Sequence, residues 1–297
     1  MTRTAVPVLI NRDGGTAKAD PGIADKVGDA LAQAGIDCAI ELIDGDGCAD
    51  RCKALVALGH RLIIVGGGDG TIGAAASVLC DTDTALGILP LGTLNHFAGD
   101  LGIESALDKA AATIAAGRRA KVDVAEVNGR TFINNSAIGL YPRMVIDREA
   151  QQQRLGRSKR LALLVAAVRT LFRFEHQQLT LAVNDHEARV DTPLLFVGNN
   201  DYRLDISGAG QRSSLAQGRL CVLVMARNSR LGFLAAVARA LAGRTRREDL
   251  IRIDDVTEIR VDSKRSSLRF TLDGEVATMA PPLRYRIRPG ALTVVAP

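Results

Sequence analysis

Blocks of apolar residues alternate with amphipathic segments along residues 1–120. Four short, apolar, β-branched runs predict buried strands, and four segments have the spacing of apolar positions that is typical of helices. The predicted strands are residues 5–10, 38–43, 62–65 and 85–89, and the predicted helices are residues 23–34, 48–58, 72–79 and 104–117. Strands that alternate with helices pair in parallel through right-handed crossovers. The pattern therefore predicts an open α/β sheet, in which ligands bind beyond the carboxyl ends of the strands.

From residue 121 the pattern changes to the two-residue period of strands. The pair Asn128-Gly129 lies between apolar runs at 122–127 and 131–138 and predicts a hairpin turn. Further predicted strands are residues 179–183, 187–190, 194–198, 220–226, 258–261, 268–272, 283–287 and 292–295. The sequence thus predicts two domains, an α/β domain over residues 1–120 and a largely antiparallel domain over residues 121–297.

Two segments with helical spacing, residues 158–174 and 230–247, interrupt the predicted strands. In the first, Arg169 and Arg173 lie opposite an apolar face, and the second ends in several arginines. Such segments fit helices that pack on the second domain with solvated arginines. They also fit basic amphipathic helices that rest on an anionic membrane.

Composition limits the kinds of partner. With 297 residues, 47% hydrophobic and 24% charged, the chain is long enough for two cores. The longest fully apolar run, residues 161–168, is too short to span a bilayer, so we expect a cytoplasmic protein. The five cysteines are scattered and predict reduced thiols. A net charge of +5 favours an anionic partner, but 3% aromatic residues and no Trp argue against single-stranded nucleic acid.

The third predicted strand ends abruptly in a glycine-rich stretch, which consists of Gly66, Gly67, Gly68, Asp69, Gly70 and Thr71. Glycines let backbone amides approach a phosphate closely, and a following helix N-terminus favours an anion. Asp69 would repel a phosphate but could serve a Mg²⁺ ion that bridges phosphates. The simpler alternative is that these glycines only turn the chain.

Two more polar turns fall at the same predicted edge of the sheet. Residues 11–15 follow the first strand, and residues 90–98, with Thr93 and Asn95, follow the fourth. Taken alone, the latter turn also fits an ordinary helix cap.

The two motifs together resemble the diacylglycerol kinase catalytic-domain family, which includes sphingosine, ceramide and bacterial lipid kinases. The matching segments are Gly-Gly-Asp-Gly-Thr and, about twenty residues later, Pro-Leu-Gly-Thr-Leu-Asn-x-Phe-Ala. NAD kinases and phosphofructokinases share the first motif, and NAD kinases differ at the second. The resemblance implies an N-terminal α/β domain of the phosphofructokinase and NAD kinase type and a C-terminal antiparallel β-sandwich. It implies nucleotide contacts from Asn11, from residues 66–71, and from Gly92, Thr93 and Asn95.

The same resemblance implies the reaction and its participants. ATP would donate its γ-phosphate to a lipid hydroxyl, with diacylglycerol as the default, in a cleft between the domains. Glu275 would be the general base with Asp273 as its neighbour, and Asp69 and Asp123 would serve Mg²⁺. The lipid would be presented at the inner face of the membrane, where the protein would bind peripherally, and a homodimer is possible.

Three departures from the family pattern leave alternatives open. Arg12 and His96 stand where many members have Pro and Asp, and Gln217 stands where an aspartate holds a structural Mg²⁺, so we expect that accessory site to be empty or weak. One alternative is therefore a non-catalytic nucleotide- and lipid-binding protein, and another is an NAD kinase-like enzyme.

Overall fold

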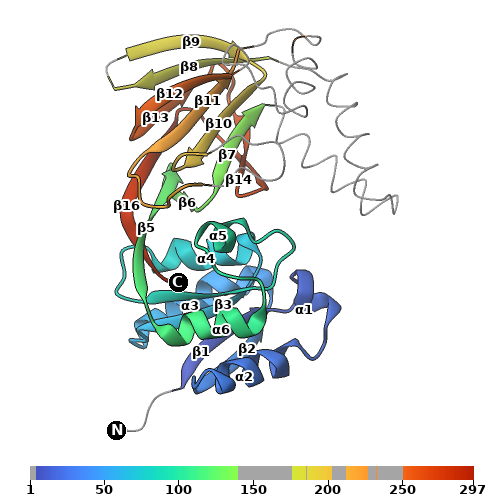
Figure 1. Cartoon of the computed structure of the whole chain (residues 1–297). Coiled ribbons are helices and arrows are strands. Elements are labelled where there is room, and N and C mark those ends of the chain that lie inside the picture. The colour runs from blue at the N-terminus through green and yellow to red at the C-terminus, as the bar shows by residue number, and fades with distance from the viewer. Residues whose placement is uncertain (1–4, 140–175, 185, 203–211, 227–231, 233–249) are drawn as a thin grey trace. The chain divides into compact units, whose positions relative to one another are not determined.

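The computed structural model describes residues 5–139, 176–184, 186–202, 212–226, 232 and 250–297 (Figure 1). The chain forms two compact units that are each discontinuous in sequence. The first contains Met1–Val124, Ser213–Gly218 and Arg288–Pro297, and the second contains Ala125–Arg212 and Arg219–Ile287. The sequence predicted a single boundary at residue 121. In the structure the chain also returns to the first unit twice after that boundary.

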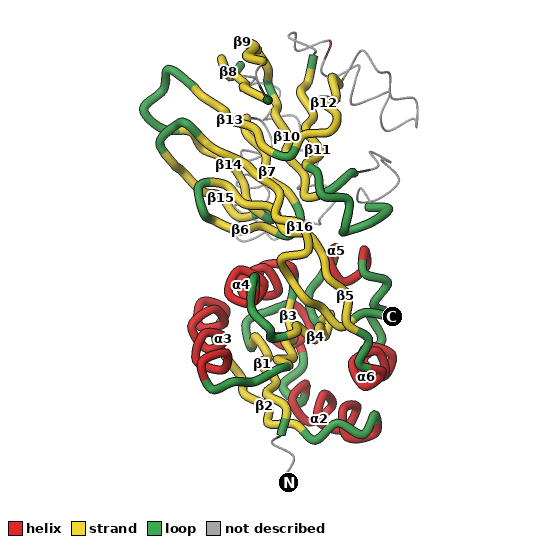
Figure 2. The backbone as a smooth tube through the Cα atoms, turned by 90° about the vertical axis from the view of Figure 1, so that its left-hand side faces the viewer, coloured by secondary structure: helices red, strands yellow, loops and turns green. Residues whose placement is uncertain are grey.

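The first unit is an open α/β sheet, as the resemblance implies. Its strands are β1 (Val6–Asn11), β2 (Cys38–Ile43), β3 (Leu62–Gly67) and β4 (Ala85–Pro90), and its helices are α1 (Gly15–Ala19), α2 (Ile23–Gln33), η1 (Gly45–Gly47), α3 (Cys48–Ala57), α4 (Asp69–Leu79), α5 (His96–Asp100) and α6 (Leu107–Ala116). The strands pair in parallel in the order β2-β1-β3-β4. Helices α3 and α4 cover one face and α2 and α6 the other (Figure 2). Because both faces are covered, β3 and β4 are buried almost throughout, which explains their continuous apolar runs.

The second unit is an antiparallel β-sandwich. Its strands are β6 (Arg130–Phe132), β7 (Asn135–Gly139), β8 (Gln177–Val183), β9 (His186–Thr192), β10 (Leu194–Asn199), β11 (Leu220–Met225), β12 (Leu250–Val256), β13 (Glu258–Asp262), β14 (Leu268–Leu272) and β15 (Glu275–Met279). One sheet has the order β12-β11-β10-β7-β14-β15. In the core, the rings of Phe132 and Tyr285 meet edge to face with centroids 6.3 Å apart.

Two long strands, β5 (Arg119–Val127) and β16 (Leu283–Val295), run from one unit into the other. Near its C-terminal end β16 pairs with β4, and near its beginning it pairs with β13. The sequence predicted two separate strands here, 283–287 and 292–295, because Pro289 and Gly290 interrupt the apolar pattern. The structure corrects this to one strand of 13 residues.

Other differences from the predicted strands have local causes. The predicted strand 131–138 is divided into β6 and β7, because the backbone N–H groups of Ile133 and Asn134 donate to a side chain rather than to a neighbouring strand. Strands β12 and β15 were not predicted; both lie at edges of their sheet, and most of their residues are exposed. The helices predicted at 158–174 and 230–247 lie outside the described residues. Among the helices that are described, none is long and apolar enough to cross a membrane.

Candidate active site

Three polar turns meet at the carboxyl ends of β1, β3 and β4. Strand β1 pairs with both β2 and β3, so the chain leaves β1 toward one side of the sheet and returns on the other. This arrangement is a topological switch point, where open α/β sheets bind their ligands. The sequence therefore placed the three turns at the correct edge.

The glycine-rich turn carries the amides that could hold a phosphate. Gly66 and Gly67 end β3, and α4 begins at Asp69 directly after Gly68. A Cβ atom on Gly66 would lie 2.8 Å from Leu91 Cδ1, and one on Gly67 would lie 2.6 Å from Thr71 Cβ. A side chain at residue 66 would thus displace the end of the Leu91 side chain, and one at residue 67 would collide with Thr71. The N–H groups in the first turn of α4 have no partner within the helix, so they form a site for an anion.

The second motif packs directly on the first. A Cβ atom on Gly92 would lie only 2.3 Å from Gly68 Cα. Asn95 has a left-handed backbone with a φ of 51°, and its side chain closes the turn. Its Oδ1 accepts from the Gly92 N–H at 2.9 Å, and its Nδ2 donates to the carbonyls of Pro90 and Gly92 at 3.2 and 3.0 Å. Asn95 therefore forms the turn, whereas the exposed Thr93 stands at its tip.

We expect Gly92→Ala to disrupt the contact between the two motifs. The added Cβ must push the backbone of Gly68 away, and overpacking of this kind costs about 1–3 kcal/mol. ATP affinity and the thermal unfolding temperature should both fall, as measured by calorimetric titration and by circular dichroism. Gly99→Ala is the matched control, because a Cβ on Gly99 meets no atom within 4 Å. An alanine at residue 92 with normal ATP affinity would refute the role given to this contact.

Asp69 joins the glycine-rich turn to the helix of the second motif. Its Oδ2 accepts from the backbone N–H of His96 and its Oδ1 from that of Phe97, both at 3.0 Å. The carboxylate therefore caps α5, a contact that the sequence did not reveal. Each oxygen keeps further capacity to accept a hydrogen bond, so Asp69 could also orient water on a Mg²⁺ ion.

Asp69→Asn is expected to weaken both the cap and the use of Mg-ATP. An Asn side chain places an NH₂ group against one of two N–H donors, which costs about 1–3 kcal/mol. The checks are the thermal unfolding temperature and the Mg²⁺ dependence of turnover. Asp29→Asn is the control, because Asp29 is exposed on α2 and makes no such contact within the described part of the chain. Wild-type Mg²⁺ dependence in the Asp69 variant would contradict the role of Asp69 toward the ion.

Asn11 and Thr71, which we expected to contact nucleotide, contact each other. Asn11 Nδ2 donates to Thr71 Oγ1 at 2.9 Å, and Asn11 Oδ1 accepts from the Asp13 N–H at 3.0 Å. Both residues are buried. The Thr16 N–H also donates to the Leu91 carbonyl at 3.0 Å, so all three turns are fastened together.

Asp123 is enclosed by backbone in the first unit. It is only 2% exposed, its Oδ1 accepts from the Gly290 N–H at 2.8 Å and its Oδ2 from the Gly218 N–H at 2.7 Å. The N–H of Asp123 donates to the Leu215 carbonyl at 2.7 Å. These partners fit Asp123 poorly as a direct metal ligand. Among the described residues, no group of three or more His, Cys, Asp or Glu side chains is placed to hold a metal ion.

The Asp-Gly-Glu segment forms a tight turn in the second unit. Asp273 and Gly274 have φ values of 48° and 91° and connect β14 to β15, where Leu272 pairs with Glu275. Positive φ at both central residues is typical of a two-residue hairpin turn. Glu275 begins β15 and is exposed, as a side chain that accepts a proton from a substrate must be.

Asp273 holds this turn against β6 and β7. Its Oδ2 accepts from the Ile133 N–H at 2.8 Å, and its Oδ1 accepts from the N–H groups of Asn134 and Asn135 at 2.8 and 3.0 Å. Burial raises the pKa of Asp273 to about 6, although these amides and the charge of Arg212 act to lower it. Asp273 is thus placed to position Glu275.

Sequence reasoning missed Arg212, which completes this network and is only 5% exposed. Its Nη1 donates to the Ile133 carbonyl at 2.6 Å and to the Asn199 carbonyl at 3.3 Å, and its Nη2 donates to Asn134 Oδ1 at 2.7 Å. Its guanidinium also lies 5.2 Å from the centroid of the Tyr202 ring. No local pattern marks residue 212, because every partner is distant in sequence or becomes adjacent only through strand pairing.

An open α/β sheet with glycine-rich turns at its switch point, joined to a β-sandwich, is the architecture of a class of nucleotide-binding proteins. Comparison with known proteins identifies the family within this class. A family model described as the diacylglycerol kinase catalytic domain matches residues 5–127. A second, described as the YegS C-terminal NAD kinase beta sandwich-like domain, matches residues 143–296. The chain therefore belongs to the family of the YegS C-terminal NAD kinase beta sandwich-like domain, whose model covers more than half of it, and its residues 5–127 match the diacylglycerol kinase catalytic domain. The resemblance inferred from the two motifs is confirmed.

Similar proteins carry related names. A probable lipid kinase YegS-like from Enterobacter sp. (strain 638) is 46% identical over 86 residues, which are 28% of this chain and 29% of that protein. A probable lipid kinase YegS from Escherichia coli O1:K1 / APEC is 49% identical over 86 residues, with the same coverage. The matched region thus spans only 29% of the length of these relatives.

Solved structures confirm the predicted fold class. A diacylglycerol kinase from Bacillus anthracis str. Sterne has a TM-score of 0.72 and 21% identity, covering 100% of this chain and 98% of that one. Yeast NADH kinase complexed with NADH has a TM-score of 0.53 and 11% identity, covering 100% and 84%. At these identities the likeness establishes the fold alone.

Proposed function

We propose that the protein is a kinase that transfers the γ-phosphate of ATP to a lipid hydroxyl, with diacylglycerol as the default acceptor. The observation that carries this proposal is the close packing of Gly68 against Gly92, which sets two glycine turns around the first amides of α4. Such a site suits the phosphates of a nucleotide. The names of the relatives support a lipid as the acceptor.

The nucleotide would bind at the switch point of the α/β sheet. The amides of Asp69, Gly70 and Thr71 would hold its phosphates, and Thr93 would reach it from the tip of the second turn. Asn11 and Asn95 would act mainly by holding the turns, because their side chains already bond to protein atoms.

The transfer step requires an acceptor hydroxyl, a base and a leaving group. The hydroxyl oxygen forms a new bond to the γ-phosphorus, and the bond from that phosphorus to the β–γ bridging oxygen breaks, which releases ADP. The Glu275 carboxylate takes the hydroxyl proton, and Asp273 holds the turn that presents it.

Mg²⁺ would enter as the complex with ATP, and it would spread the charge on the phosphates during transfer. Asp69 has the better access to the water shell of that ion, whereas the enclosed Asp123 would act by fastening residues 218 and 290. We further propose that the lipid is met at the inner face of the membrane, with the protein bound there from the cytoplasm.

The experiment is transfer of labelled γ-phosphate from ATP, with Mg²⁺, to a lipid panel in mixed micelles. The panel contains diacylglycerol, ceramide, a sphingoid base, phosphatidylglycerol and a polyprenol. A labelled lipid would establish the reaction and name the acceptor. ATP binding without any labelled product would instead support a non-catalytic nucleotide- and lipid-binding protein.

The chain shares its fold with yeast NADH kinase, so the same assay must also test phosphorylation of NAD and NADH as a competing reaction. NAD and NADH are therefore added to parallel reactions without lipid. Labelled NADP or NADPH in those reactions would replace the lipid kinase proposal.

A further inference from the structure

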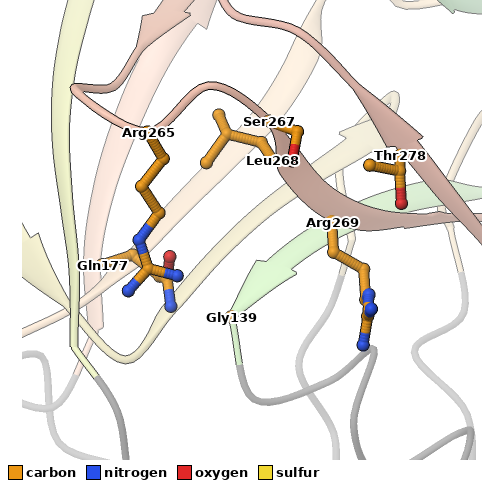
Figure 3. A pocket seen from close by; sticks show the side chains of 7 residues that line it. All are labelled: Gly139, Gln177, Arg265, Ser267, Leu268, Arg269 and Thr278. Carbon is orange, nitrogen blue, oxygen red and sulfur yellow. The ribbon is translucent and has the colours of Figure 1, made fainter.

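A cavity of about 270 Å³ lies at the edge of the β-sandwich, away from the Asp273 turn (Figure 3). It is formed where β7 and β15 end and where β8 and β14 begin. Its polar side chains come from Gln177, Arg265, Ser267, Arg269 and Thr278. We call it the Arg265–Arg269 cavity. Because the Asp273 turn lies at the opposite end of β14, the proposed transfer reaction does not use this cavity.

The charged side chains that line the cavity, among the described residues, are all positive. Arg265 and Arg269 contribute two guanidinium groups, and none of the described residues that line the cavity is acidic. Within the described part of the chain, neither guanidinium forms an ion pair within 4 Å. A guanidinium is always protonated, and its planar set of donors matches the oxygens of a phosphate. Two such groups, neither of them paired with a described carboxylate, therefore favour an anion.

Gln177 provides a donor that is enclosed by the fold. It begins β8 and is only 7% exposed, yet the described residues provide no hydrogen-bond partner for its side-chain amide. In Figure 3 the Arg265 and Arg269 side chains extend on the two sides of Gly139. The hydroxyls of Ser267 and Thr278 are further donors.

The acidic groups near this edge are already engaged. Asp191 lines an adjacent hollow together with Arg265, but its Oδ2 lies 3.3 Å from His176 Nδ1. Asp262 Oδ1 accepts the N–H of Ser263 at 2.8 Å. Both carboxylates thus have a contact outside the cavity, and neither is among the described residues that line the Arg265–Arg269 cavity itself.

We propose that the Arg265–Arg269 cavity binds the phosphate monoester group of a small molecule or of a lipid headgroup. A phosphate monoester carries close to two negative charges at pH 7, which match the two guanidinium groups. Its oxygens can also accept hydrogen bonds from Gln177, Ser267 and Thr278. This site is separate from the nucleotide turns and does not depend on kinase activity.

The test compares two pairs of substitutions in the full chain. Arg265→Gln with Arg269→Gln removes both charges from the cavity, and Arg189→Gln with Arg284→Gln removes two exposed charges elsewhere on the sandwich strands as the matched control. The probes are sn-glycerol 3-phosphate by calorimetric titration, and phosphatidylcholine vesicles with or without phosphatidic acid by co-sedimentation. We expect the cavity pair to weaken binding about tenfold or more and the control pair to leave it nearly unchanged.

The two probes distinguish the source of the phosphate. Loss of binding to both probes would indicate any phosphate monoester, and loss with vesicles alone would indicate a lipid headgroup. Equal binding by the wild type and the cavity pair would overturn the proposal, as would an equal loss in the control pair. Gln177→Met, which keeps the length of the side chain, should give a smaller loss if the amide is a ligand. Loss of folding in any variant is detected separately by circular dichroism.

Discussion

Replacing Glu275 with Gln is expected to lower the kcat of phosphate transfer by about 10²–10⁴-fold, the contribution typical of a general base. Glutamine keeps the size of the side chain and the backbone pairing with Leu272, but it cannot take a proton from the acceptor hydroxyl. ATP affinity should stay nearly unchanged, because Glu275 lies outside the α/β unit that we propose holds the phosphates. Steady-state kinetics and calorimetric ATP binding measure the two quantities.

The control for this substitution is Glu258→Gln, which removes the charge of another exposed glutamate, on β13. Its kcat should equal that of the wild type. A Glu275 variant with unchanged kcat would remove Glu275 from the mechanism. A parallel loss of kcat and of the unfolding temperature would show instead that Glu275 acts on the fold.

The α/β unit could be predicted from the sequence because its signals are local. Strands covered on both faces must be apolar throughout, and parallel strands bring their carboxyl ends to one edge. Short motifs at that edge therefore meet without any knowledge of side-chain packing. The edge strands β12 and β15 gave weaker signals, because most of their residues are exposed and their apolar positions do not follow the two-residue period of a strand.

The contacts of the site could not be predicted in the same way. The bond from Ile133 to Asp273 joins residues 140 positions apart, and the bond from Arg212 to Ile133 joins residues 79 positions apart. The pairing of β14 with β7 brings Asp273 to Ile133, and Arg212, which lies outside both strands, reaches Ile133 from another part of the chain. The cap that Asp69 forms on α5 depends likewise on how the two turns stack. Sequence motifs thus identified the residues at the edge, whereas their partners required the fold.

The network around Asp273 has a defined dependence on pH. The pKa of Asp273 is about 6 in the folded protein, compared with an ordinary value of 3.8. The folded state therefore binds this proton more tightly than the unfolded state. The contribution of Asp273 to the free energy of unfolding falls as the pH rises from about 4 to about 6, where the buried group becomes charged. Arg212 opposes this fall, because its charge stabilises the ionised carboxylate.

Arg212→Met is expected to lower the free energy of unfolding by about 1–3 kcal/mol at pH 8, the cost typical of leaving a buried hydrogen-bond acceptor without its donor. The variant leaves Asn134 Oδ1 without its donor, whereas the Ile133 carbonyl keeps the hydrogen bond from Asn199 Nδ2 at 2.9 Å. The loss should be smaller at pH 5, because Asp273 is then protonated and no longer needs a positive neighbour. Urea unfolding followed by circular dichroism measures both values, since the chain contains no Trp for fluorescence.

Two further variants decide whether this loss comes from the network. Arg284→Met removes an exposed arginine on β16 and should change stability by less than about 0.5 kcal/mol. Arg212→Lys keeps the charge but loses the planar set of donors, so it should recover only part of the stability. If Arg212→Met were equally destabilising at pH 5 and pH 8, the coupling between Arg212 and Asp273 would be absent. The turn that carries Glu275 would then be held by the three backbone amides alone.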